Sequence, residues 1–195
     1  MDNINLDDLL TFTGDDSFSL LNYKIGLTKR EIYIDSDITE QFAEMVVFPF
    51  KWMEQDDPTA PIHIYINCQG GNITDAMVLC DLIDNTKCPV TIEIVGYAYS
   101  MACYLAMAGF SNPNVKTICH KHSFGLIHAG SVGYSGDARK AKQIQEFYDK
   151  IDNLLKDYIL SHTKITEEQY AEKEDIEWYL TSADMLELGI VDEIV

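Results

Sequence analysis

Apolar and polar positions along the chain follow two periods, and the order of these periods predicts an α/β fold. Runs rich in alternating β-branched or aromatic residues, the pattern of strands, occur at 31–35, 61–67, 89–95, 117–119 and 124–127. Apolar residues three or four positions apart, the pattern of helices, occur at 39–50, 74–85 and 100–108. Strands that alternate with helices predict a mainly parallel sheet, in which ligands bind beyond the carboxyl ends of the strands.

Two predicted helices have features of their own. In the first, we expect Thr39 to be the N-cap and Pro49 to kink or end the helix. Another, at about 138–162, is the longest in the chain, and its apolar residues step by three and four from Ile144 to Ile159. At 1.5 Å per residue, about 24 residues form a rod of about 36 Å. Such a rod either projects toward another subunit or packs as a core helix, and the pattern leaves both open.

Composition limits the class of protein and its partners. The chain has 195 residues, and we expect an N-terminal arm over 1–30 followed by one domain over 31–195. A formal net charge of −18 disfavours binding to nucleic acid or to an anionic membrane surface. Five cysteines without Cys-x-x-Cys spacing indicate neither a disulfide framework nor a zinc site. With no signal-peptide pattern and no apolar stretch long enough to span a bilayer, we expect a cytoplasmic protein without a membrane segment.

The segment Gly96-Tyr-Ala-Tyr-Ser100-Met-Ala carries the first candidate catalytic residue. Ser100 lies where a predicted strand ends and a helix begins, so its hydroxyl is exposed beside the free N–H groups of the helix start. A serine nucleophile needs both features. Serine is also a favoured helix N-cap, and the motif alone leaves a purely structural role open.

Other positions at the same edge of the predicted sheet could complete a site. Gly70 and Gly71 follow a strand, where backbone N–H groups can approach an oxyanion. A serine nucleophile needs a general base, and His128, at the end of a strand, is the best placed of the five histidines. His120 and His122 lack a third ligand nearby in sequence, so we expect no metal site.

Several segments together resemble the family of Clp protease proteolytic subunits, ClpP. The resemblance extends over residues 30–195 in one order, with an apparent insertion near 110–114. The motifs that carry it are Tyr65-Ile-Asn-Cys-Gln-Gly70-Gly71, Gly96-Tyr-Ala-Tyr-Ser100 through Gly109, Leu126-Ile-His128, Gly133-Tyr-Ser-Gly136, and Leu180-Thr-Ser-Ala-Asp through Asp192.

The resemblance implies a crotonase-like ClpP fold with a compact head and a handle at about 129–162. It implies heptameric rings of identical subunits stacked in pairs, and an AAA+ Clp unfoldase that uses ATP to deliver unfolded polypeptides. The subunit itself would need no cofactor. By this resemblance the catalytic residues are Ser100 and His128, the oxyanion N–H donors are Gly71 and Met101, and the substrate backbone pairs with Gly70, Ile73 and Ser131.

The chain departs from the family's pattern at its third catalytic position. Glu177 stands where the family has aspartate, and Asp175 lies two residues earlier; we expect Glu177 to orient His128, as glutamate does in some other serine hydrolases. Ile176 replaces an arginine that, in the family, senses ring stacking, so the stacking of rings is open.

Three other functions stay open at this point. The chain could be a weak or silent ring subunit that assembles with active paralogues, which the departures at Glu177 and Ile176 allow. It could be a crotonase-fold acyl-CoA enzyme, although such an enzyme would need no serine–histidine pair. It could be a Ser-Lys hydrolase, but no lysine near Ser100 fits the role.

Overall fold

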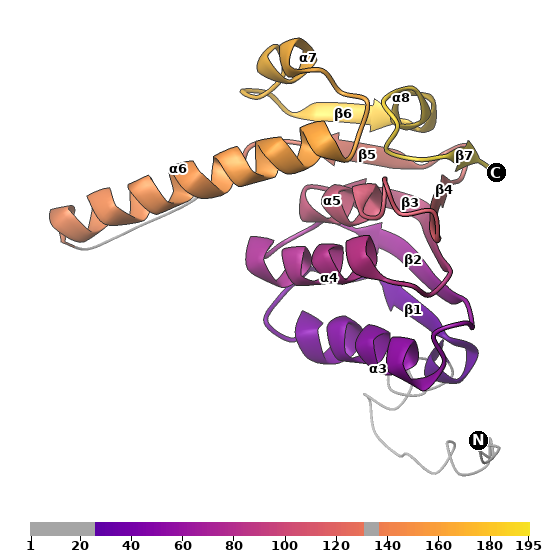
Figure 1. The fold of residues 1–195 in the computed structure, drawn as a ribbon. Helices are drawn as coiled ribbons and strands as arrows, with labels where there is room; N and C mark the ends of the chain where they lie inside the picture. The colour runs from indigo at the N-terminus through magenta and orange to yellow at the C-terminus, as the bar shows by residue number, and fades with distance from the viewer. Residues whose placement is uncertain (1–25, 131–136) are drawn as a thin grey trace.

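A computed structural model describes residues 26–130 and 137–195 (Figure 1). Most of the expected N-terminal arm and the candidate residue Ser131 lie outside these ranges. The strands are β1 (Glu31–Ile34), β2 (Ile62–Cys68), β3 (Val90–Tyr99), β4 (Val115–Cys119), β5 (Phe124–Ile127), β6 (Trp178–Thr181) and β7 (Glu193–Ile194). The helices are η1 (Ala43–Val47), α3 (Phe48–Asp56), α4 (Ile73–Asn85), α5 (Met101–Met107), α6 (Ala138–Ser161), α7 (Glu167–Ala171) and α8 (Ser182–Glu187).

A mainly parallel sheet forms the centre of the head and confirms the predicted fold class. Its strands follow the order β1-β2-β3-β4-β7, and all these neighbours are parallel. β5 pairs in parallel with the end of β3, and β6 then pairs antiparallel with β5. In β2, Ile62, Ile64 and Ile66 are buried, while the residues between them are partly exposed. This alternation follows from the two-residue repeat of a strand, because α3, α4 and α5 cover the same face of the sheet (Figure 1).

The first predicted helix begins later than expected and changes its hydrogen-bond pattern at Pro49. Thr39 is not its cap: the π-helical turn η1 has Phe42 at the N-cap without a side-chain capping bond. η1 ends at Val47 and α3 follows directly, with Pro49 in its first turn, and Val47 and Phe48 both have helical φ and ψ. The chain therefore stays helical, and the π-helical hydrogen bonds end just before Pro49, which has no N–H to donate.

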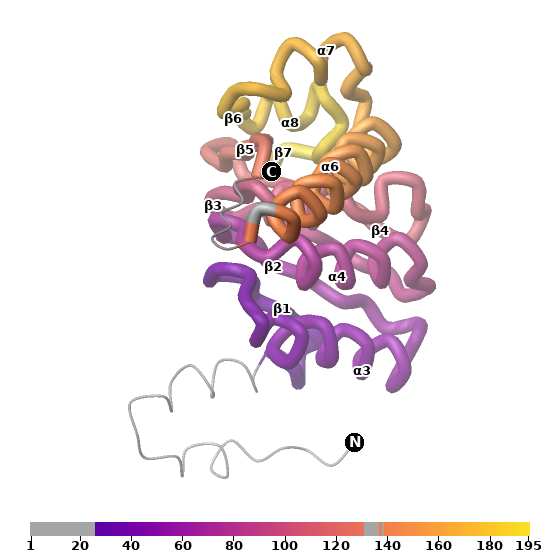
Figure 2. The backbone as a smooth tube through the Cα atoms, turned by 90° about the vertical axis from the view of Figure 1, so that its left-hand side faces the viewer, coloured from indigo at the N-terminus to yellow at the C-terminus, as the bar shows by residue number. Residues whose placement is uncertain are grey.

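The long helix α6 fits both sequence interpretations. Its 24 residues leave the head as a projecting rod (Figure 1), which Figure 2 shows from near its free end. At the carboxyl end Leu155, Tyr158 and Ile159 are buried against the head. Phe147, farther out, is 59% exposed, and Leu154, next to Leu155 but on another side of the helix, is 53% exposed. The rod therefore carries an uncovered apolar surface. Over the two described ranges, none of the helices combines the length and apolar character that spanning a bilayer would need.

Candidate active site

Ser100 joins β3 to α5 in a strained backbone conformation. Its φ is +53° and its ψ is −127°, a region that favours glycine and costs other residues about 1–3 kcal/mol. The Ser100 N–H donates to the Leu126 carbonyl at 2.9 Å, and the Ser100 carbonyl accepts from the Cys103 N–H at 2.8 Å. The hydroxyl makes no capping bond to α5 and no hydrogen bond to any other described residue. Ser100 is therefore the N-cap residue of α5 by position, but its hydroxyl does not cap the helix and is available for chemistry.

The turn after β2 brings two glycines against the start of α5. Gly70 has φ +99°, and a Cβ atom there would lie 2.8 Å from the Ser100 Cβ and 2.9 Å from the Met101 nitrogen. Gly71 has φ +145°, and a Cβ there would lie 2.2 Å from the Ile38 carbonyl oxygen. Only glycine fits these two positions, because a side chain would collide with backbone on each side.

Two backbone N–H groups are free near Ser100. Ile38 bridges the glycine turn: its N–H donates to the Gly70 carbonyl at 2.8 Å, and its carbonyl accepts from Asn72 N–H at 2.8 Å. The intervening Gly71 N–H has no backbone partner within the described residues. Met101 begins α5, and the first N–H groups of a helix have no acceptor inside it. Neither the Gly71 N–H nor the Met101 N–H is used by the described backbone, so both are available as donors.

Three positions are candidates for contact with the substrate backbone. The Gly70 carbonyl accepts from the Ile38 N–H, and its second lone pair can still accept from a substrate N–H. Ile73 is the first residue of α4, and its N–H likewise lacks an intrahelical acceptor. Ser131 lies outside the described residues.

Strand pairing places Glu177 directly opposite His128. In the antiparallel pair of β5 and β6, Leu126 faces Tyr179 and Ile127 faces Trp178, so the next opposed positions are 128 and 177. Opposed residues have Cβ atoms about 4.5–5.5 Å apart, close enough for direct contact. His128 Nδ1 lies 2.9 Å from Glu177 Oε1. Asp175 is two positions away in this register and makes no hydrogen bond to His128, although both residues are described.

Ser100 and His128 lie at neighbouring strand ends without a hydrogen bond between their side chains. β3 and β5 are parallel, with Tyr99 opposite Leu126. Ser100 and His128 follow these two residues by one and two positions, at the same edge of the sheet. No hydrogen bond joins these two described side chains, and the His128 side chain is 28% exposed. Such bonds are often long in free enzymes and tighten only around a substrate.

The thiol beside the glycine turn is not a competing nucleophile. Cys68 Sγ donates to the Ser36 carbonyl at 3.0 Å and accepts from the Gly70 N–H at 3.3 Å. Burial is the main cause that raises the pKa of this thiol. It therefore stays protonated near neutral pH and serves to shape the turn.

Of the four remaining histidines, His63, His120 and His162 have carboxylate partners, and His122 has none among the described residues. His63 Nε2 lies 2.7 Å from one Glu93 oxygen, and His120 Nε2 lies 2.8 Å from the other. In the described ranges no group of three or more histidine, cysteine or acidic side chains could hold a metal ion. His162 Nε2 lies 3.2 Å from Asp84 at the base of α6.

Comparisons with known proteins agree with the motifs that the sequence displays. The model of the Clp protease family matches residues 16–195. The ATP-dependent Clp protease proteolytic subunit of Deinococcus radiodurans is 26% identical over 185 residues, covering 95% of this chain and 88% of that protein. The mainly parallel sheet with several helices is consistent with the ClpP fold. The chain belongs to the Clp protease family.

Proposed function

We propose that the protein is the serine endopeptidase subunit of an ATP-dependent Clp protease, and that it cleaves unfolded polypeptides delivered by an AAA+ unfoldase. The observation that carries this proposal is the arrangement at one edge of the sheet. A strained serine with a free hydroxyl lies against two free N–H groups, and a histidine bonded to a carboxylate stands at the adjacent strand end. The proteolytic subunit at 26% identity supports the same activity.

The proposed reaction is acyl transfer through a covalent intermediate. His128 takes the proton of the Ser100 hydroxyl, whose oxygen attacks the peptide carbonyl carbon. The N–H groups of Gly71 and Met101 bind the oxyanion of the tetrahedral intermediate. His128 then gives its proton to the leaving amine, and water attacks the acyl-enzyme by the same steps. These steps use only side chains and backbone of this chain, so the ATP would be consumed by the partner.

The missing bond between Ser100 and His128 favours one alternative, a weak or silent subunit that assembles with active paralogues. A fluorophosphonate probe separates the two, because it reacts only with an activated serine. We expect labelling at a single residue, Ser100, in the native protein and none after heat denaturation. Peptide mapping of the adduct checks the position. A native, assembled protein that takes up no probe would favour the silent subunit.

Assembly into rings stacked in pairs is part of the same proposal, with α6 as a contact between subunits. Phe147 and Leu154 are more than half exposed on α6 and leave apolar area uncovered. Burying the exposed part of each would contribute roughly half of the 1.5–3 kcal/mol that full burial of such a side chain gives. All five cysteines lie within the described residues, form no disulfide and are buried, which suits the reducing cytoplasm.

We expect Phe147→Glu and Leu154→Glu to shift the native mass toward smaller species, because each places a charge in the proposed contact. Gln145→Glu is the matched control: it adds the same charge to α6 about 200° away from Phe147, at 100° per residue. Native mass spectrometry gives the result. A monomeric parent protein at micromolar concentration, or equal masses for all variants, would contradict the role of α6. Leu155 is unsuitable for this test because it is buried in its own head.

A further inference from the structure

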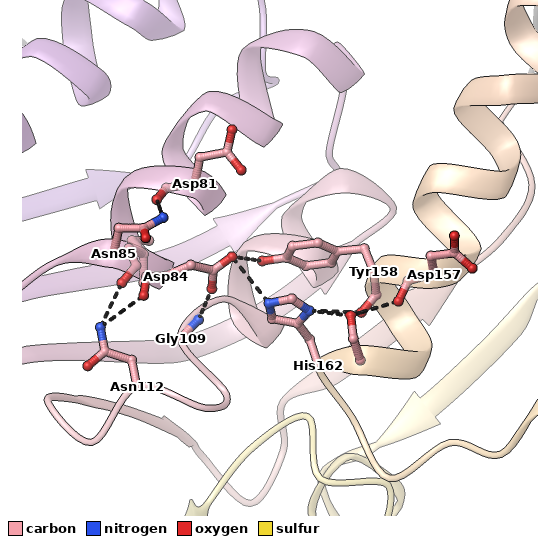
Figure 3. A network of polar contacts seen from close by, with 10 residues as sticks. Asp81, Asp84, Asn85, Gly109, Asn112, Asp157, Tyr158 and His162 are labelled. Atoms are coloured by element: carbon pink, nitrogen blue, oxygen red, sulfur yellow. Dashed lines mark hydrogen bonds and ion pairs between the residues drawn. The ribbon is translucent and has the colours of Figure 1, made fainter.

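A cluster of polar side chains fastens the base of α6 to the head (Figure 3). Asp84, near the end of α4, accepts from the Gly109 N–H through Oδ1 at 2.6 Å. Its Oδ2 accepts from the Tyr158 hydroxyl at 3.1 Å and lies 3.2 Å from His162 Nε2. Tyr158 and His162 belong to the last turn and the C-cap of α6. One carboxylate therefore holds together α4, the segment after α5, and the end of the projecting helix.

The surroundings of the His162 ring contain acceptors on both sides. The ring stacks on Tyr158 with centroids 3.8 Å apart and 11° between the planes. Its Nε2 faces the Asp84 carboxylate, which can only accept. Its Nδ1 lies 3.0 Å from the Tyr158 carbonyl oxygen, which can also only accept, and 2.9 Å from the Ser161 hydroxyl.

The contacts around the ring accommodate an imidazolium. With a hydrogen on each ring nitrogen, Nε2 donates to Asp84 and Nδ1 donates to the Ser161 hydroxyl, which keeps its own hydrogen for the Asp157 carbonyl at 2.7 Å. A neutral ring with its hydrogen on Nε2 is also satisfied, because the Ser161 hydroxyl can then donate to Nδ1 and the Tyr158 carbonyl still accepts from the His162 backbone N–H at 2.9 Å. The charged form is distinguished by the ion pair, because only an imidazolium places a positive charge against the partly buried Asp84 carboxylate.

We propose that His162 is held as an imidazolium between Asp84 and the end of α6, and that it acts as a proton-dependent latch which fastens the projecting helix to the head. A cation at this position also suits the carboxyl end of a helix, where unpaired carbonyls create a partial negative charge. Loss of the proton removes the ion pair and leaves an uncharged hydrogen bond from the neutral ring to Asp84. The helix base is then held less strongly, because a hydrogen bond between charged groups contributes more than one between a charged and a neutral group.

The pKa directions in the cluster agree with this geometry. For His162, burial alone would lower the pKa, but the hydrogen bond and charge of Asp84 outweigh it and raise the pKa above its usual value. For Asp84, burial alone would raise the pKa, but hydrogen bonds from His162 and Gly109 outweigh it and lower the pKa. Burial raises the pKa of Tyr158 and of the neighbouring Cys80 thiol, so both stay neutral near pH 7. The Asp157 carboxylate points away from the ring (Figure 3).

The sign of the pH dependence follows from these directions. The stabilisation from His162 is complete below the ordinary histidine pKa of about 6.5 and is lost as the pH rises through the raised pKa. The stabilisation from Asp84 is present above the ordinary aspartate pKa of about 3.9 and is lost as the pH falls through its lowered pKa. The latch is therefore closed at mildly acidic pH, and it opens as the pH rises through the raised pKa of His162.

Two exchange measurements on the full chain test the latch without any use of catalytic activity. Mass spectrometry of histidine C2–H exchange gives the pKa of each histidine in an assembly of any size. We expect His162 to titrate above about 6.5, the ordinary value. Backbone hydrogen exchange is corrected for the intrinsic dependence of the exchange rate on pH. The last turn of α6 should then lose about ten- to hundredfold of its protection as His162 deprotonates. That factor corresponds to the contribution of one hydrogen bond between charged groups. A pKa of 6.5 or below for His162, or unchanged protection across its titration, would overturn the proposal.

Variants separate the ion pair from general packing. Asp84→Asn keeps the shape but removes the charge, so the His162 pKa should fall and the protection of the α6 end should become independent of pH. His162→Gln should remove the same pH dependence. His120→Gln is the matched control, because His120 also pairs with a carboxylate, that of Glu93 on β3, and makes no hydrogen bond to α6. A pH-dependent loss of α6 protection that survives in both Asp84→Asn and His162→Gln would assign the effect to other groups.

Discussion

Replacing Ser100 by alanine should lower kcat for peptide hydrolysis by about 10⁶-fold, the loss typical of a serine hydrolase without its nucleophile. The expectation rests on the position of the hydroxyl, which has no structural hydrogen bond among the described residues and lies beside the N–H groups of Gly71 and Met101. Hydrolysis of a fluorogenic peptide by the purified assembly gives the measurement. Near-normal turnover by Ser100→Ala would show that Ser100 is not the nucleophile.

The same substitution should leave folding and assembly intact. Alanine removes only the hydroxyl, and the backbone hydrogen bonds to Leu126 and Cys103 do not depend on the side chain. Ser100→Gly offers a second test of the site, because glycine adopts a positive φ without strain and should raise the free energy of unfolding by about 1 kcal/mol relative to alanine. Ser111→Ala, at an exposed loop position, is the control for the loss of a hydroxyl elsewhere. Its activity should equal that of the parent protein.

The fold could be predicted where local pattern and burial agree. β2 alternates buried isoleucines with partly exposed residues, which is the pattern of a strand with helices on one face. The helix boundaries in the region of η1 and α3 could be predicted less accurately. Thr39 and Pro49 carry strong local signals, but Phe42, Val46 and Phe50 are buried against the core, and that packing sets where the helices begin. Tertiary packing outweighs a cap or a proline whose contribution is about 1–3 kcal/mol.

The site was predictable only in part, because its residues are positioned by backbone contacts that have no sequence signature. Ser100 stands out by its place between a strand and a helix. Nothing in the sequence identifies Ile38, whose backbone holds the turn at Gly70 and Gly71, since any residue can provide those hydrogen bonds. The same is true of Leu126, whose carbonyl fixes the Ser100 N–H. Which carboxylate faces His128 depends on the register of β5 and β6, and the sequence does not show this register.

That register also sets how strongly Glu177 can act. The side chain reaches His128 Nδ1 at 2.9 Å, but it is 53% exposed, so water competes for the carboxylate. A buried orienting aspartate can contribute about 10⁴-fold to kcat, partly because an amide in its place forces the wrong histidine tautomer. An exposed glutamine at position 177 can rotate its oxygen toward His128, so the tautomer is not forced. What Glu177 contributes is therefore mainly its charge beside the imidazolium that forms during the reaction.

We expect Glu177→Gln to lower kcat by about 10- to 100-fold, the range of one hydrogen bond to a charged group, with little change in KM. Glu177→Asp keeps the charge but withdraws the carboxylate by one carbon–carbon bond, about 1.5 Å, and should recover part of the lost turnover. Such rescue by charge distinguishes orientation of His128 from a purely structural role. Asp175→Asn is the matched control and should leave kcat unchanged, because residue 175 is not opposite His128. If Asp175→Asn were the damaging change and Glu177→Gln harmless, the working register of β5 and β6 would differ by two residues from the one in the structure.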